Sequence, residues 1–155
     1  MKQDDLISLL DRSKFLFMRE ISEPEGNSLC LVVEEAIVDS SATTPVDIPR
    51  QYSGLQMGAS PIRSTDTCKI FELRWHRYIA YLVTEEMAGS AGSYKEENFT
   101  GNLFRTYTRS HFLDHLSRDT GGHAEPIVHH KVVCQNHLID VASYDQPIVT
   151  LLPRT

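Results

Sequence analysis

The chain has 155 residues, of which 41% are hydrophobic and 23% charged, and its formal net charge is −6 at pH 7. Such a composition is typical of a folded globular protein, and this length predicts a single domain over residues 1–155. The acidic balance and the scattered Lys and Arg residues argue against binding to nucleic acid, and no apolar run approaches the roughly 20 residues that cross a bilayer.

The three cysteines, Cys30, Cys68 and Cys134, are odd in number and far apart in the sequence. Such spacing favours free thiols in a reducing compartment over a framework of disulfides. A cytoplasmic location is therefore predicted.

The first forty residues predict a short helix followed by a hairpin. Residues 4–11, DDLISLLD, place leucines on one side, with Asp4 expected to cap the helix. Residues 14–21 and 29–38 are predicted strands, and the turn-forming residues 22–27 between them, SEPEGN, indicate a first hairpin.

Residues 39–67 are rich in Ser, Thr, Pro and Gly, so a long connection is expected there. An irregular edge segment with a short strand near 54–59 is the favoured interpretation, and a binding loop is the alternative.

The segment 68–84, CKIFELRWHRYIAYLVT, alternates apolar residues at every second position, which is the period of a β-strand. Two strands result, 71–75 and 78–83, and His76 with Arg77 is expected to turn the chain between them. The pattern predicts a central antiparallel hairpin. A second polar loop, over 88–101, follows it.

The last third predicts a strand at 102–107, a helix at 109–118 ended by Gly121 and Gly122, and a hairpin of 128–134 with 137–142. If Gln135 and Asn136 form the loop, Lys131 faces Asp140 and Val133 faces Leu138. Residues 148–152 are a predicted edge strand.

These elements predict an α+β fold, in which mainly antiparallel hairpins form a sandwich or a partly open barrel. The residues predicted to form the core are Phe15, Leu31, Val33, Phe71, Leu73, Ile79, Tyr81, Phe104, Phe112, Leu116, Val133 and Ile139.

A metal site is the first chemical hypothesis, because His111 and His115 lie four residues apart on a predicted helix, with His123 downstream. Further candidate ligands follow at His129, His130, Cys134 and His137. On a helical wheel, however, the apolar residues Phe112, Leu113 and Leu116 lie away from the histidines, so a solvated helix face is favoured.

Three further patterns resemble catalytic motifs. Cys134 would face His137 across the last hairpin, which could lower the pKa of the thiol, but no third orienting group is identifiable. Residues 88–92, AGSAG, fit a relaxed nucleophile elbow, and residues 119–121, DTG, match half of an aspartic protease site. A turn and a helix cap are the favoured interpretations of these two.

Three runs, ELRWHRYIAYLVTEE, LFRTYTRSHFLDHL and NHLIDVAS, resemble small uncharacterised bacterial proteins over about the C-terminal 60% of the chain. The resemblance implies a bacterial source and a β-rich fold, and it implies no activity, cofactor or site residue.

Taken together, the sequence favours a non-enzymatic binding or interaction module without a cofactor, such as a bacterial immunity-type protein whose acidic surface suits a basic protein partner. One alternative is a small metal-dependent or His-based hydrolase that uses some of the following residues: His111, His115, His123, His130 and His137. Another is a carrier with a ligand cavity in the sheet.

Overall fold

The computed structural model describes residues 2–41, 44–45, 58–86, 96–119 and 126–154. Its helices and strands are α1 (Gln3–Asp11), β1 (Phe15–Ser22), β2 (Leu29–Val38), β3 (Thr44–Pro45), β4 (Gly58–Ala59), β5 (Ile62–Arg63), β6 (Ile70–Trp75), β7 (Tyr78–Glu85), β8 (Asn98–Thr100), β9 (Phe104–Arg109), α3 (His111–Asp119), β10 (Val128–Val133), β11 (His137–Ser143) and β12 (Ile148–Leu152).

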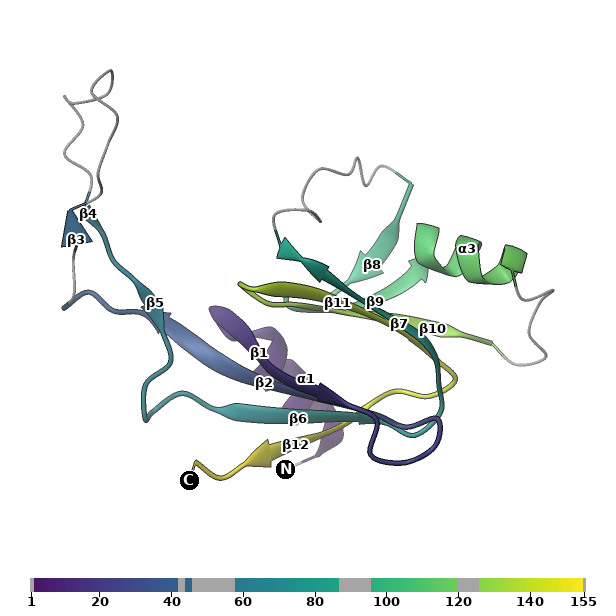
Figure 1. Cartoon of the computed structure of the whole chain (residues 1–155), viewed down its shortest axis with the longest axis horizontal. Helices are drawn as coiled ribbons and strands as arrows, with labels where there is room; N and C mark the ends of the chain where they lie inside the picture. Colours follow the sequence, from purple (N-terminus) through teal and green to yellow (C-terminus); the bar gives the residue numbers. More distant parts are fainter. Residues whose placement is uncertain (1, 42–43, 46–57, 87–95, 120–125, 155) are drawn as a thin grey trace, which may run out of the picture.

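The longer strands form two antiparallel sheets that face each other (Figure 1). The first sheet has the order β1-β2-β6-β12, with β5 also beside β2, and the second has the order β7-β11-β10-β9-β8. Helix α3 lies on the outer face of the second sheet, the face turned away from the first, while α1 packs against β12 and β9. The fold is thus an α+β sandwich and not a closed barrel, which confirms the predicted class.

The prediction of a central hairpin was wrong. Strand β6 pairs with β2 and β12 in the first sheet, whereas β7 pairs with β11 in the second. The turn at His76 and Arg77 therefore carries the chain from one layer to the other. Alternation of apolar residues shows that a strand exists, but it does not say which strand lies beside it.

The other two predicted hairpins are confirmed. Strands β1 and β2 pair over seven residues with one irregularity near Met18, and β10 pairs with β11. In the second pair Lys131 faces Asp140 and Val133 faces Leu138, which is the predicted register.

Both helices begin at a different residue from the one predicted. Asp4 does not cap α1, because the helix starts one turn position earlier with Lys2 as its N-cap, and Asp5 Oδ2 accepts the Lys2 amide at 3.2 Å. Helix α3 starts after Ser110, whose Oγ accepts the Leu113 amide at 3.1 Å. A hydroxyl that binds the third amide of the helix in this way ends the preceding strand and starts the helix at a defined residue.

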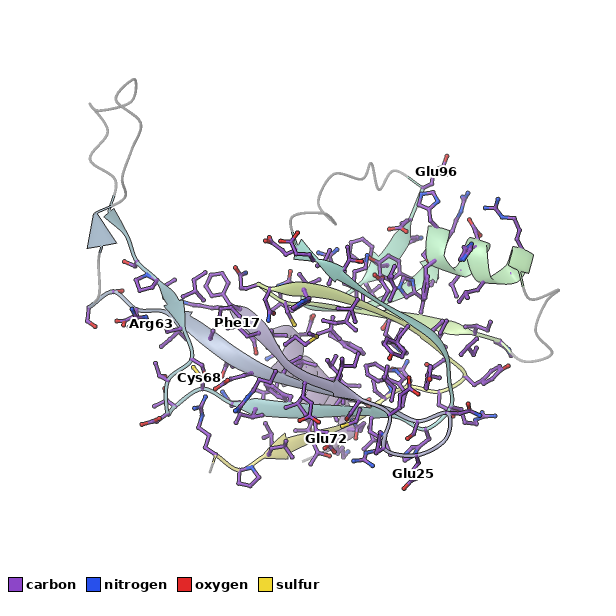
Figure 2. All side chains as sticks on the ribbon, in the orientation of Figure 1. Phe17, Glu25, Arg63, Cys68, Glu72 and Glu96 are labelled. Atoms are coloured by element: carbon purple, nitrogen blue, oxygen red, sulfur yellow. The ribbon has the colours of Figure 1, made fainter. Side chains whose placement is uncertain are left out.

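One hydrophobic cluster fills the space between the sheets and includes Leu10 of α1 (Figure 2). Of the predicted core residues, the buried ones are Leu31, Val33, Phe71, Leu73, Phe104, Leu116 and Ile139. The prediction was wrong for Tyr81, which is 37% exposed, and for Val133, where the neighbouring Val132 is buried instead. Those that are only partly buried are Phe15, Ile79 and Phe112. In β1 both faces are apolar, so the pattern could not distinguish Phe15 from the fully buried Leu16.

Two side chains tie distant segments together. Asp11 Oδ1, at the end of α1, accepts the amides of Asn102 at 2.7 Å and Phe104 at 2.8 Å. This turn needs Gly101, because its φ is 91° and a Cβ there would lie 2.0 Å from the Phe104 carbonyl oxygen.

The second tie is made by Asn136, in the turn between β10 and β11. Its Oδ1 accepts the Met18 amide at 2.9 Å and its Nδ2 donates to the Met18 carbonyl at 3.0 Å. The side chain thus pairs with β1 at the irregularity in that strand, as a neighbouring strand would.

Neither of the two described helices is of a length and apolar character that would let it cross a membrane.

Candidate functional site

The densest group of polar side chains lies on the outer face of the second sheet, beneath α3. It centres on β10, where His129 and His130 point to opposite faces because adjacent strand residues alternate. His129 contacts Phe112 of α3 on the outer face, and His130 contacts Trp75 of the first sheet on the inner face.

His129 is held at both ring nitrogens. Its Nε2 lies 2.7 Å from Asp140 Oδ1 and its Nδ1 lies 2.8 Å from Ser110 Oγ. The side chains come from β10, from β11 and from the residue before α3. All three residues are buried, with exposed fractions of 1% for His129, 1% for Ser110 and 7% for Asp140.

The order of protons along this chain follows from the chemistry of its ends. An ionised carboxylate only accepts, so the neutral imidazole carries its hydrogen on Nε2 and donates it to Asp140. Nδ1 then accepts the hydroxyl hydrogen of Ser110. The three residues have the polarity of a Ser–His–Asp catalytic triad, with a base that could remove the serine proton.

Two features separate this group from a working triad. In serine proteases the serine meets Nε2 and the acid meets Nδ1, whereas here the two nitrogens are exchanged. Ser110 Oγ is also buried and already accepts the Leu113 amide. What the arrangement does chemically is therefore to fix α3 on the sheet: one hydroxyl caps the helix and binds a strand residue at once.

A charged pair completes the outer cluster. Lys131 Nζ lies 3.2 Å from Asp140 Oδ1, and the Tyr107 ring stacks on His129 with centroids 4.3 Å apart. Burial would lower the pKa of Lys131, but the Asp140 carboxylate, with Tyr107 and Glu97, outweighs this effect and raises it. Lys131 is therefore a buried cation at neutral pH, and Asp140 is its counter-ion.

Two buried oxygens in the same cluster, Tyr107 Oη and Glu97 Oε2, have no hydrogen-bond partner among the described residues. Glu97 Oε1 accepts the amide of His111, so this carboxylate also lies at the N-terminus of α3, at 3.1 Å. Negative charge is favourable there because the helix dipole is positive at that end.

On the inner face His130 has a different environment. It is fully buried between the Phe104 ring, at 5.3 Å between centroids, and Trp75, whose Nε1 donates to Nδ1 at 3.4 Å. Burial lowers its pKa to about 4, against a smaller opposing contribution from Gln146. Nε2 has no hydrogen-bond partner within bonding distance among the described residues. His130 thus acts as a neutral, aromatic core residue.

The residues of the metal hypothesis are not gathered by the described part of the chain. His111 and His115 are exposed on α3, and His123 lies outside the described residues. Within the described ranges no three His, Cys, Asp or Glu side chains are close enough together to share an ion. The structure therefore brings no third described ligand to the His111 and His115 pair.

The Cys134 and His137 hypothesis needs a correction. The Cys134 amide does donate to the His137 carbonyl at 2.9 Å, so the two residues flank the turn as predicted. The thiol, however, is buried in the hydrophobic core, and burial raises its pKa to about 12 instead of lowering it. Cys134 is not a poised nucleophile. The other two motifs, at 88–92 and at Thr120 and Gly121, fall outside the described residues.

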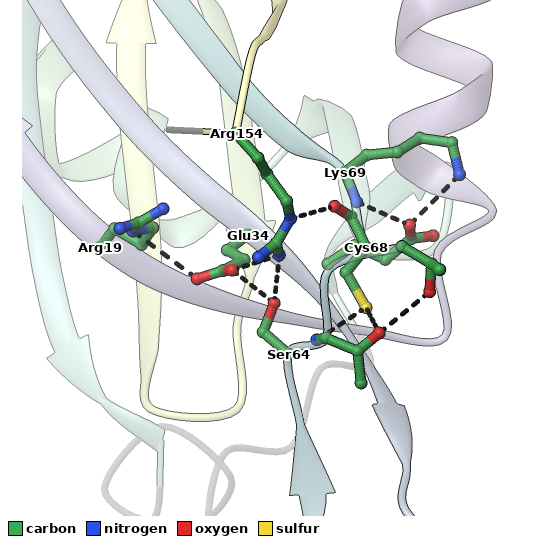
Figure 3. A network of polar contacts seen from close by, with 9 residues as sticks. Arg19, Glu34, Ser64, Cys68, Lys69 and Arg154 are labelled. Atoms are coloured by element: carbon green, nitrogen blue, oxygen red, sulfur yellow. Dashed lines mark hydrogen bonds and ion pairs between the residues drawn. The ribbon is translucent and has the colours of Figure 1, made fainter.

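A second polar network lies in the first sheet, where the strand facing β2 is interrupted between β5 and β6 (Figure 3). Glu34 of β2 accepts hydrogen bonds from Ser64 and Arg154 and pairs with Arg19 at 3.6 Å. Burial would raise the pKa of Glu34, but these bonds and charges outweigh it and hold the pKa below its usual value. Arg154 Nε also donates to the Cys68 carbonyl at 2.7 Å, so the network holds the residues after β12 against the interruption. Its role is structural.

The exposed apolar side chains lie on the outermost strands. Strand β7 ends the second sheet and exposes Tyr81 (37%) and Leu82 (50%), and β12 ends the first sheet and exposes Ile148 (48%). Of the two, β7 is the longer, with eight residues against five.

Fold and site together define a two-layer antiparallel sandwich with a closed polar cluster and an apolar edge strand. Comparison of the chain with models of protein families, with curated proteins and with solved structures finds no match. Any function must therefore be argued from these side chains.

Proposed function

We propose that this protein is a non-enzymatic binding module that pairs with an extended strand of another polypeptide along β7. The observation that carries the proposal is that an eight-residue strand at the edge of the second sheet exposes two large apolar side chains, Tyr81 and Leu82.

An outermost strand offers every second backbone N–H and C=O group to a new neighbour, because its own sheet uses only the other half. Strand addition at such an edge gains affinity from main-chain hydrogen bonds and specificity from alternate side chains. Tyr81 and Leu82 supply one apolar contact on each face of the strand. Natural edge strands are more often short, charged or covered, so an open apolar edge supports a binding role.

The closed state of the Ser110, His129 and Asp140 group supports the non-enzymatic part. A general base must reach the proton that it removes from a bound substrate, and a buried serine leaves no room for one. The hydrogen bond from the Leu113 amide already uses an acceptor site on that oxygen.

The finer features of the proposal rest on composition. Three free, buried cysteines suit a reducing, cytoplasmic setting. A net charge of −6 suits a basic partner, as in a bacterial immunity-type protein, because opposite charge accelerates encounter.

The test is site-specific photocrosslinking in cells of the source organism. A crosslinking amino acid at position 82 is compared with one at position 148, which is about equally exposed but lies on the edge of the other sheet. We expect one defined product from position 82 alone, lost when the purified components are retested with Leu82→Glu and kept with Ile148→Glu. Equal products from both positions, or none from position 82, would contradict the proposal.

A further inference from the structure

The order of charges along β7 points to the identity of its partner. His76 and Arg77 precede the strand, its centre is apolar, and Glu85 and Glu86 end it. All four charged or titratable residues are exposed. An antiparallel neighbour with the same sequence would place its basic end against the acidic end of β7 and its apolar centre against the apolar centre. We infer that the strand added to β7 is β7 of a second copy of this chain, an inference that rests on the proposed function.

The register of this pair follows from geometry. In a continuous antiparallel sheet related by a two-fold axis, facing residues must lie on the same face, so their numbers add to an even sum. A pair centred on Tyr81 meets this condition and places Ile79 opposite Val83 and Arg77 opposite Glu85. His76 then faces Glu86. A pair centred on Leu82 would instead place the uncharged Tyr78 opposite Glu86, so the centre at Tyr81 is the register that matches charges at both ends.

The expected dimer is weak. One added strand pair buries less surface than the roughly 1,200–2,000 Å² of a stable interface, so association should depend on concentration. Arg77 already contacts Asp145 at 3.0 Å, with both side chains about half exposed, and the Glu85 of the second copy would join that pair. Because the charges at the ends are exposed, added salt should weaken the dimer.

The experiment uses two charge reversals and their mixture. In Arg77→Glu alone, glutamates face each other across the axis twice, and in Glu85→Arg alone, arginines do. Sedimentation equilibrium should show a wild-type dimer whose dissociation constant rises about tenfold or more in each variant. An equimolar mixture should recover the wild-type affinity as a heterodimer, because both contacts become Arg–Glu again. Native mass spectrometry of differently tagged variants identifies that species.

Several outcomes would overturn the inference: a wild-type chain that stays monomeric to about 1 mM, single variants that dimerise as the wild type does, or a mixture that does not recover. Circular dichroism first confirms that each variant is folded, and if Arg77→Glu is not, His76→Glu with Glu86→Arg repeats the design one residue further out. A monomeric wild type whose position 82 still crosslinks to a different protein, in a manner sensitive to Leu82→Glu, would refute self-pairing and leave the proposed function standing. Failure of both experiments would refute both.

Discussion

His129 and His130 are neighbours in the sequence, and the two faces of the second sheet treat them in opposite ways. On the outer face His129 has a partner at each ring nitrogen, and its acid partner also neutralises Lys131. On the inner face His130 is surrounded by rings, and burial drives its pKa to about 4. The comparison shows that one side-chain type can serve as a polar bracket or as a core aromatic, according to whether its nitrogens meet partners.

The two solutions differ in what they make fragile. A buried charged cluster depends on every member, because removal of one leaves another buried without compensation. A neutral histidine in an apolar core depends on pH, because it cannot take up a proton without water. Mutation should therefore strike the outer face hardest, and acid the inner face.

The largest effect is expected for Asp140→Ala. This change leaves Lys131 as a buried cation and His129 without an acceptor, which should lower the free energy of unfolding by about 3–5 kcal/mol. Urea denaturation at pH 7 measures it. The matched control is Asp145→Ala, whose pair with Arg77 is about half exposed and is expected to contribute at most about 1 kcal/mol. Equal losses in the two variants would show that the outer cluster does not depend on its carboxylate.

The next largest effect is the pH dependence due to His130. At pH 7 the ring is neutral in both folded and unfolded chains, so it adds no pH-dependent term. Below an unfolded pKa of about 6.5 the unfolded chain binds a proton that the folded chain refuses until about pH 4, so stability falls as pH falls through this window. The shift corresponds to about 3 kcal/mol.

This second prediction is measured as a difference. His130→Leu removes the titrating ring, so between pH 7 and pH 4 its free energy of unfolding should fall by about 3 kcal/mol less than that of the wild type. Parallel curves for the two proteins would mean that the folded chain accepts the proton, and that the inner face is less apolar than its side chains indicate.

A smaller effect is expected for Ser110→Ala. It removes the cap of α3 and the hydroxyl that His129 Nδ1 accepts, for a loss of about 2 kcal/mol in total. Hydrogen exchange should show the loss as faster exchange of the Leu113 amide, whose acceptor is Ser110 Oγ. Unchanged exchange at Leu113 would contradict the role of Ser110 as the link between helix and sheet.

The smallest effect is expected for His111→Ala, one residue further on. This side chain is exposed, so the free energy of unfolding should change by less than about 0.5 kcal/mol. The variant is also the control for Ser110→Ala. A larger loss, or a loss that appears only after treatment with a chelator, would revive the metal hypothesis for α3.

Local pattern was enough to predict most of the fold. Strand β2 has the predicted bounds, and the facing of Lys131 with Asp140 followed from a two-residue loop alone. Layer assignment could not be predicted in this way. The turn at His76 has the same composition whether the chain doubles back beside itself or crosses to the other sheet, and only long-range pairing with β2 and β11 decides.

The outer cluster was missed although part of its signal was present. His129 lies two residues from Lys131 on the same strand, so it shares the face on which Asp140 was predicted. Ser110 could not be predicted, because it reaches His129 only through the pairing of β9 with β10 and the exact start of α3. Attention to His111 and His115 followed helical spacing, which locates a face but not what covers it.

The bond between Asp11 and the turn at Asn102 has a consequence for how the protein is made. A growing chain leaves the ribosome from its N-terminus at about 5–20 residues per second, and the two groups are 91 positions apart. The first helix therefore emerges about 5–20 s before its docking site exists. During that interval its leucines are exposed, so the nascent chain passes through a state that a chaperone can recognise before the sandwich closes.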